Sequence, residues 1–381
     1  MQGKRFAPCK SGFYMLKAKH SLLLRLISFL LILLSLLPAA LLPCAAAPLA
    51  FFFPVVGRPS SPGAADQQPA VMLIPGGQPF GVRMHTEGVM VVSLSEVVAG
   101  GKPTCPAREA GVRVRDVILS LNGVAVKDAE EVTAAIHASG GKPLSLCILR
   151  DNAQKTLTVT PVKSDKSGEY ACGMYIRDSA SGIGTVTFLV PESGLFGGLG
   201  HGVCDSDTGA LVPLSRGNVL SVRISGAARG EAGNPGELRG SFTGKRIGSI
   251  VTNCECGVFG LLSDPPAGKY PAMPIARASE ISEGEATILC TLGGDGIGEY
   301  KVEISGIDHS ARPTKSFTVH VTDEALLART GGIVQGMSGS PIIQNGRLIG
   351  AVSHVLVDDP TTGYGIFIEN MLAHMKMRAV A

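Results

Sequence analysis

A serine between glycines, followed at once by a hairpin pattern, constrains this sequence more than any other stretch. In the run GMSG (336–339) the glycines can adopt backbone conformations that other residues avoid, so the amides near Ser338 can converge on one point. Shortly afterwards Asn345-Gly346 separates two apolar runs, which is the strongest short-range signal of a β-hairpin. The pattern therefore predicts a serine hydroxyl on a tight turn directly ahead of a rigid pair of strands.

The composition favours short strands and turns over long helices. The chain has 381 residues, of which 49 are glycine, and only 17% are charged. From residue 164 onward, short apolar runs alternate with turn residues, which predicts a β-barrel or sandwich of about 200 residues. The net charge of +3 and the absence of tryptophan argue against a nucleic-acid partner. We therefore expect a mainly β protein that binds no nucleic acid.

Residues 1–56 are predicted to form a cytoplasmic tail followed by a membrane anchor or signal. Six basic residues precede the apolar stretch 26–50, which is long enough to span a bilayer, so the rest of the chain would be exported. A cleaved signal peptide is the alternative, although the proline after Ala45-Ala46-Ala47 disfavours cleavage there. Residues 57–70 are rich in Pro, Ser, Gly and Gln, which is typical of a flexible linker.

Residues 71–163 contain a motif with a specific resemblance. The run EAGVRVRDVILSLNGVAV (109–126) resembles the signature of bacterial PDZ domains, and Asp128 with Glu131 predicts a capped helix directly after it. The resemblance implies that Phe80, Gly81 and Val82 form the loop that binds a peptide carboxylate, beside a strand that pairs with the ligand. We therefore assign residues 71–163 to a PDZ domain.

A histidine among glycines, His201 in GGLGHGV (197–203), is the candidate general base for Ser338. His354 competes with it, but its place on the strand after the serine predicts that it points into the sheet. An acid between His201 and Ser338 would repeat the chain order of chymotrypsin, in which the acid orients the imidazole. The candidate acids from the residues alone are Asp205, Asp207, Asp295, Asp308 and Asp323.

The nine cysteines have no regular spacing, which argues against a disulfide scaffold. His201, Cys204, Cys254 and Cys256 offer nitrogen and sulfur ligands of the kind that zinc takes, but their spacing is tighter than that of the usual zinc motifs. Buried thiols are the favoured interpretation, so we predict no metal and no cofactor.

The run GGIVQGMSGSPIIQNGRLIGAVSHVLVDDPTTGYGIFIENML (331–372), with GLGHGV and a PDZ domain behind a membrane segment, resembles the stage IV sporulation protein B (SpoIVB) peptidases of endospore-forming bacteria. These are serine peptidases of the chymotrypsin-like clan, so residues 164–381 are expected to form a β-barrel peptidase domain. The resemblance implies Ser338 as nucleophile, His201 as base and Asp323 as acid, with Asp205 in reserve. We expect the backbone amides of Gly336 and Ser338 to form the oxyanion hole.

The resemblance also implies a biological setting. Such peptidases are exported across the inner forespore membrane, where they are anchored or released into the intermembrane space. They cut themselves near the N-terminus, which here predicts a site within residues 50–75, and then cleave a membrane-tethered regulator of an intramembrane metalloprotease. This cleavage triggers pro-sigma-K processing.

The PDZ domain would hold a substrate tail or the chain's own N-terminal segment. The alternative function is a catalytically silent PDZ-containing envelope scaffold or signalling protein. An envelope protease of the HtrA type is disfavoured, because there the peptidase precedes the PDZ domain.

Overall fold

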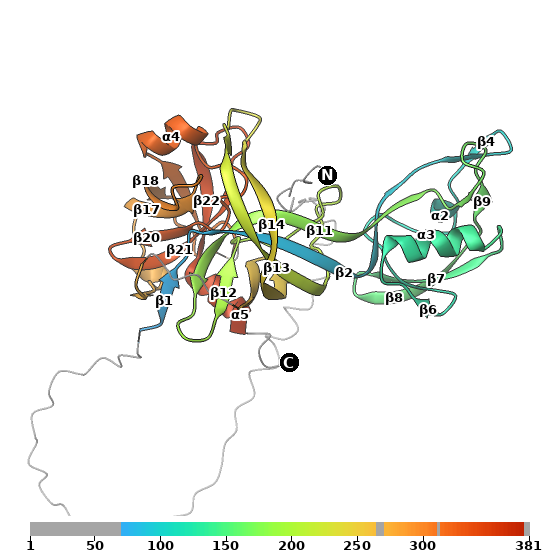
Figure 1. Ribbon diagram of the computed structural model, residues 1–381, viewed down its shortest axis with the longest axis horizontal. Helices are drawn as coiled ribbons and strands as arrows, with labels where there is room; N and C mark the ends of the chain where they lie inside the picture. The colour runs from blue at the N-terminus through green and yellow to red at the C-terminus, as the bar shows by residue number, and fades with distance from the viewer. Residues whose placement is uncertain (1–69, 264–269, 311–312, 377–381) are drawn as a thin grey trace, which may run out of the picture. The chain divides into compact units, whose positions relative to one another are not determined.

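The computed structural model describes residues 70–263, 270–310 and 313–376. The predicted tail and anchor (1–56) and all of the linker except Ala70 lie outside the described residues. Within the described ranges, no helix is long and apolar enough to cross a membrane. The described chain is mainly β, as predicted, and its strands form two barrels and a PDZ domain (Figure 1).

Six strands close a first barrel. They pair in the order β2, β11, β12, β15, β14 and β13, and β13 pairs with β2 again. Their bounds are β2 (Pro79–Leu94), β11 (Met174–Leu189), β12 (Leu195–Gly198), β13 (Leu214–Ala228), β14 (Glu237–Cys254) and β15 (Gly257–Leu262). Inward-facing apolar side chains fill the barrel, and Phe80 packs edge-on against Phe196 with ring centroids 5.5 Å apart. Two short strands, β1 (Met72–Pro75) and β16 (Met273–Pro274), extend this sheet beyond β11.

The PDZ domain is inserted into this first barrel. The chain leaves the barrel along the second half of β2 and returns along the first half of β11, and the two halves pair with each other from Met90 to Leu94. The inserted elements are β3 (Val97–Ala99), β4 (Lys102–Thr104), α2 (Pro106–Glu109), β5 (Val117–Leu121), β6 (Val124–Ala125), α3 (Ala129–Ala138), β7 (Leu144–Arg150), β8 (Ala153–Val159), β9 (Val162–Lys163) and β10 (Tyr170–Ala171). As predicted, the Asp128 carboxylate caps α3 by accepting the Glu131 amide at 2.8 Å.

Residues 72–75 and 79–86 belong to the sheet of the first barrel. The first half of β2 pairs with the second half of β11 on one side and with β13 on the other. These residues were predicted to belong to the PDZ domain, because a linear sequence does not show that one domain interrupts a strand pair of another.

The second barrel is closed by the strand order β17, β18, β19, β22, β21 and β20. Its elements are η1 (Ala278–Glu280), β17 (Gly284–Thr291), β18 (Ile297–Ser305), β19 (Phe317–Val321), α4 (Glu324–Thr330), β20 (Pro341–Gln344), β21 (Arg347–Val355), β22 (Thr362–Phe367) and α5 (Ile368–Lys376). The predicted hairpin is confirmed, since β20 and β21 meet at Asn345 and Gly346, which both have positive φ.

An apolar cluster joins the two barrels. Phe188 and Phe259 of the first barrel pack in one buried cluster with Ile366 of the second barrel and Met371 of α5. The C-terminal helix is therefore part of the core between the barrels, and the loops that follow β12 and α4 lie where the barrels meet.

Candidate active site

The turn that carries Ser338 connects α4 to β20. Gly336 and Gly339 have φ angles of +98° and +95°, a region that L side chains rarely adopt. A Cβ atom on Gly339 would lie 2.1 Å from the Thr185 carbonyl oxygen, so a larger residue cannot fit there without moving the backbone. The structure therefore requires the glycines that identified this turn in the sequence.

Strand β11 of the first barrel holds the serine turn in place. The Thr185 amide donates to the Ser338 carbonyl at 3.0 Å, and the Thr185 hydroxyl donates to the Gly336 carbonyl at 2.9 Å. The Thr187 hydroxyl donates to the Gly339 carbonyl at 2.8 Å. Sequence reasoning missed both threonines, although two hydroxyls at a spacing of two in the otherwise apolar run 182–190 were a usable signal.

The two predicted oxyanion-hole amides are not committed to other acceptors. In the serine turn, the amides of Met337, Gly339 and Ser340 donate to carbonyls of the same barrel. Within the described part of the chain, the amides of Gly336 and Ser338 have no such acceptor. Amides in this state can stabilise a negative oxygen that develops next to the serine.

The Ser338 hydroxyl and the His201 imidazole both lie against β21. Ser338 Oγ donates to the Ser353 carbonyl at 3.2 Å. A Cβ atom on Gly200 would lie 3.5 Å from Ser353 Cα, so the loop that carries His201 passes directly over the same residue. No hydrogen bond joins Ser338 to His201 among the described residues, and each side chain is instead bound to a nearby carbonyl.

The His201 ring is held by its own loop. Nδ1 of His201 lies 2.9 Å from the Gly202 carbonyl, which can only accept, so Nδ1 carries the proton and Nε2 has the lone pair. Burial lowers the pKa of His201, although this hydrogen bond acts in the opposite direction. The imidazole is therefore neutral near pH 7, the state that a general base needs.

His354 lies on β21, the strand after the serine, as predicted, and its ring packs beside the ring of His201. The two ring centroids are 5.1 Å apart with a tilt of 38°. Nδ1 of His354 is buried and has no hydrogen-bond partner among the described residues. Burial first, and then repulsion by the charges of His201 and Lys315, lowers the pKa of His354 to about 3.

The structure does not bring Asp323 to the imidazole. Asp323 caps α4: its Oδ1 accepts the Leu326 amide at 2.9 Å and its Oδ2 accepts the Lys301 amide at 3.2 Å. Both carboxylate oxygens are used at the start of a helix in the second barrel. The expectation that Asp323 orients His201 is corrected accordingly, because a carboxylate just before a helix satisfies the helix's first amides.

The reserve acid, Asp205, is also engaged elsewhere. It is buried and forms an ion pair with Arg177 of β11, and it accepts the Thr208 amide at 2.9 Å. Burial would raise its pKa, but the Thr208 hydrogen bonds and the Arg177 charge hold the pKa of Asp205 below its usual value. Asp205 stabilises the loop that follows His201 and does not contact the imidazole as a hydrogen-bond acceptor.

Phe80, Gly81 and Val82 do not form a peptide-binding loop. They lie within β2, which pairs with β11 on one side and β13 on the other, so their backbone groups face partner strands. Phe80 and Val82 are buried in the core of the first barrel. The prediction for these three residues is wrong, because the PDZ domain is inserted later in the chain than the sequence analysis assumed.

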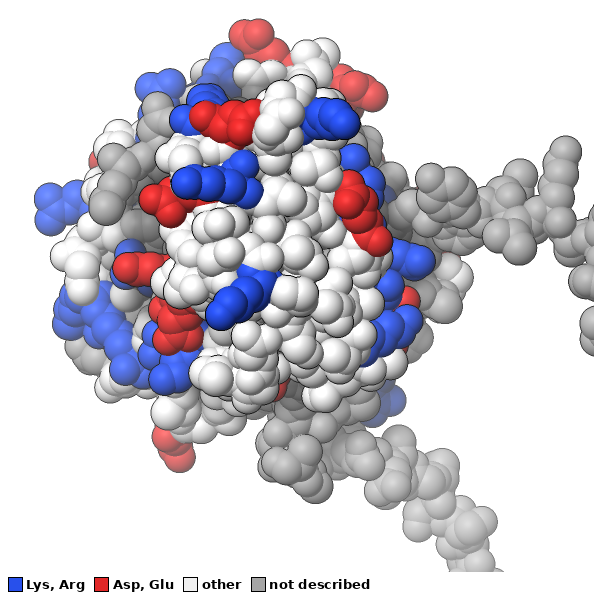
Figure 2. Space-filling model, turned by 90° about the vertical axis from the view of Figure 1, so that its right-hand side faces the viewer, with Lys and Arg blue, Asp and Glu red and all other residues white. Residues whose placement is uncertain are grey.

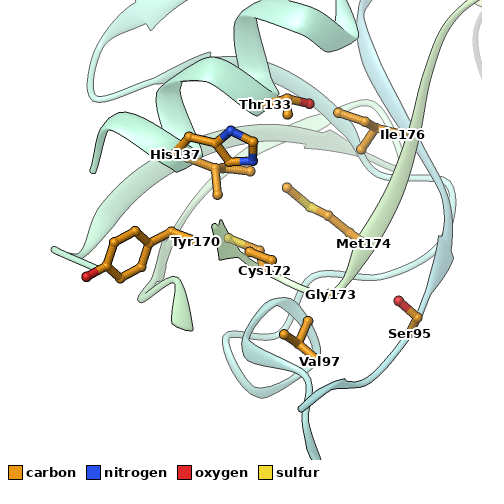
Figure 3. Close-up of a pocket in the computed structure, with 11 residues that line it drawn as sticks. Ser95, Val97, Thr133, His137, Tyr170, Cys172, Gly173, Met174 and Ile176 are labelled. Atoms are coloured by element: carbon orange, nitrogen blue, oxygen red, sulfur yellow. The ribbon is translucent and has the colours of Figure 1, made fainter. Parts of the chain in front are cut away.

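The PDZ groove lies between α3 and the first half of β11. A pocket of about 190 Å³ opens there, with His137 on one side and Met174 on the other (Figure 3). Gly173, with φ +74°, immediately precedes the strand at the end of this pocket. The full lining is Ser95, Val97, Thr133, Ile136, His137, Tyr170, Ala171, Cys172, Gly173, Met174 and Ile176.

The groove has the construction that strand addition requires. Residues 174–177 of β11 pair with β2 on one side, and α3 lies across the pocket on the other. Figure 2 views the molecule from the side on which Figure 1 labels α3, β7 and β9, and charges of both signs are scattered over a face that is mostly uncharged. The pocket lining contains no Asp, Glu, Lys or Arg, so it suits an apolar peptide better than a strongly charged one.

The zinc ligands weighed from the sequence do not gather into one site. Cys204 Sγ lies 3.7 Å from the Gly202 carbonyl, and Cys254 Sγ lies 3.7 Å from the Gly257 carbonyl. Cys256 instead lies beside His374 of α5, a residue that the sequence analysis did not consider.

Comparisons with known proteins agree with this architecture. The family model described as SpoIVB peptidase S55 matches residues 168–372, and a PDZ domain model matches residues 97–150. Probable protease eep of Enterococcus faecalis is 38% identical over 61 residues, which are 16% of this chain and 14% of that protein. The chain therefore spans only a small part of that relative's length.

Two solved structures are also similar. The Rv3671c protease of M. tuberculosis in its active form is 19% identical with a TM-score of 0.30, over 51% of this chain and 73% of that one. The PDZ domain of the SdrC-like protein from Listeria monocytogenes is 21% identical with a TM-score of 0.20, over 24% of this chain and 87% of that one.

Proposed function

The chain belongs to the SpoIVB peptidase S55 family and is a serine endopeptidase, and from this premise we propose how its residues divide the reaction. Ser338 attacks the scissile carbonyl while Nε2 of His201 takes the hydroxyl proton and later gives it to the leaving amine. The amides of Gly336 and Ser338 stabilise the oxyanion, each donor contributing about 3 kcal/mol. The observation that carries this proposal is that both side chains lie against β21: Ser338 Oγ donates to the Ser353 carbonyl and the His201 ring packs beside His354. The amides of Gly336 and Ser338, which have no backbone acceptor within the described residues, lie in the same turn.

The Gly202 carbonyl, and not the predicted acid, orients the imidazole of His201. It accepts the proton on Nδ1 of His201, with 2.9 Å between the nitrogen and the oxygen, and so keeps the lone pair on Nε2. His354 packs beside this ring and stays neutral, which keeps a second positive charge away from the imidazolium that forms during the reaction.

The PDZ domain presents substrate to this site. A protein tail, or the chain's own N-terminal segment, adds as a strand along residues 174–177 of β11 and raises the local concentration of substrate. The same strand continues to Thr185 and Thr187, which hold the serine turn. Occupancy of the groove is thereby coupled to the geometry of Ser338.

We assign the protein to the sporulation pathway that its family resemblance implies. The substrate is a membrane-tethered regulator of an intramembrane metalloprotease, and its cleavage triggers pro-sigma-K processing. The N-terminal segment takes the chain across the inner forespore membrane, and the chain cuts itself within residues 50–75. The support for this assignment is family membership together with the apolar stretch 26–50.

The test is a time course of N-terminal sequence and intact mass for the full chain, wild type beside Ser338→Ala. We expect the wild type to shorten at one site within residues 50–75 and the variant to stay whole. If both stay whole, even when a peptide from the membrane-tethered regulator is added and remains uncut, the proposal fails and the silent scaffold is the better description.

A further inference from the structure

Three potential metal ligands meet outside the catalytic residues. Cys256 Sγ lies 3.8 Å from His374 Nε2, and Glu255 Oε1 lies 3.8 Å from the same nitrogen. All three ligand atoms lie within 4.8 Å of one another. The cluster joins the turn between β14 and β15 to the C-terminal helix α5.

The histidine of this cluster is already oriented for coordination. Nδ1 of His374 lies 2.9 Å from the Asn370 carbonyl one helical turn earlier, so this nitrogen carries the proton. The lone pair is then on Nε2, which faces Cys256 and Glu255. A hydrogen bond from the other ring nitrogen to a backbone carbonyl is the usual support of a metal-binding histidine.

The combination of ligands selects the metal. A thiolate, an imidazole and a carboxylate together suit Zn²⁺, whereas Ca²⁺ and Mg²⁺ prefer oxygen ligands alone. In a tetrahedral zinc site, neighbouring ligand atoms lie roughly 3.3–3.6 Å apart, given bonds of about 2.0–2.3 Å. The observed separations of 3.8 Å need only a small adjustment to close around an ion.

We propose that Glu255, Cys256 and His374 bind one zinc ion, with water in the fourth position. An ion can reach the site from the side of Glu255, because the Glu255 side chain is 67% exposed, whereas Cys256 is fully buried. This site departs from the sequence prediction of no metal, and it does not depend on the proposed peptidase mechanism.

A metal here would connect the C-terminal helix to the loop of the general base. The Glu255 carbonyl accepts the Gly202 amide at 3.1 Å, directly next to His201. On the other side, Ile368 and Met371 anchor α5 in the core between the barrels. Zinc would therefore stabilise the position of the His201 loop relative to the second barrel.

The experiment is a cobalt titration of the full metal-free chain, followed by displacement with zinc and by thermal unfolding. Wild type is expected to bind one Co²⁺ with a thiolate-to-cobalt absorption band, and zinc is expected to remove the band and raise the unfolding midpoint. Cys256→Ala should lose the band. Glu255→Gln and His374→Gln should bind at least about tenfold more weakly, since loss of even an outer-shell partner costs that much.

The matched controls are Cys147→Ser and His320→Gln, a partly exposed thiol and an exposed imidazole away from the cluster, which should titrate like wild type. A wild type without the band overturns the proposal, and so does a folded Cys256→Ala variant that keeps it. If Cys256→Ala does not fold, unchanged affinity in both Glu255→Gln and His374→Gln is the overturning result, because these two substitutions are conservative and lie nearer the surface.

Discussion

Substitution of Asp323 distinguishes between two roles for this residue, a helix cap and a catalytic acid. In the structure its carboxylate accepts two backbone amides, those of Leu326 and Lys301, at 2.9 and 3.2 Å. Loss of an N-cap side chain costs about 0.5–2 kcal/mol, so Asp323→Ala should lower the free energy of unfolding by about that amount. Asn caps helices about as well as Asp, and Asp323→Asn should therefore keep nearly full stability.

The effect on catalysis should follow the effect on folding. α4 ends at Thr330, from which the chain runs into the serine turn, so Asp323→Ala should lower kcat/KM only as far as the loosened helix disturbs Ser338. Asp323→Asn should stay within about twofold of wild type, whereas loss of a true triad acid to Asn costs about 10⁴-fold. The assays are peptide hydrolysis and urea unfolding of the three proteins.

A matched control comes from the PDZ domain. Asp128 caps α3 with the same geometry, far along the chain from the serine turn, so Asp128→Ala should cost similar stability and leave kcat intact. A folded Asp323→Asn protein with a loss near 10⁴-fold would refute the assignment of Asp323 as a cap and return it to the triad.

Three further results are expected. Thr185→Val leaves the partly buried Gly336 carbonyl without its donor and should lower the free energy of unfolding by about 1 kcal/mol and also lower the rate of hydrolysis. Thr185→Ser should keep both at the wild-type level, as unfolding and hydrolysis assays will show. Gly339→Ala should abolish hydrolysis, because its Cβ would lie 2.1 Å from the Thr185 oxygen. Stability should fall as the pH drops from about 6.5 towards about 3, since the unfolded chain protonates His354 in this range and the native chain does not. Urea unfolding at several pH values should show that the free energy of unfolding changes less with pH in His354→Leu than in wild type.

Local patterns predicted the parts of the fold that local chemistry determines. The Asn345-Gly346 turn, the capped helix at Asp128 and the glycines around Ser338 each depend on a few adjacent residues, and each is found as expected. The mainly β class followed from short apolar runs for the same reason.

Features that depend on distant segments were missed. Phe80 was predicted to lie in a loop but lies in the core of the first barrel, because the PDZ domain is inserted into a strand pair of that barrel. No residue adjacent to Phe80 indicates this insertion. The packing of the His354 ring beside the His201 ring was not predicted, because it depends on the approach of the loop after β12 to β21 of the other barrel. Asp323 was chosen among the five candidate acids through resemblance, whereas its hydrogen bonds are those of a helix cap.

The most direct test of the account is labelling of the full chain with a fluorophosphonate probe, followed by peptide mass mapping. Wild type should carry one adduct, on Ser338, and His201→Ala should label far more slowly because the hydroxyl has lost its base. His320→Gln serves as the control and should label at the wild-type rate. An adduct on another residue, or equal labelling of His201→Ala and wild type, would contradict the assignment of Ser338 and His201 as the catalytic pair.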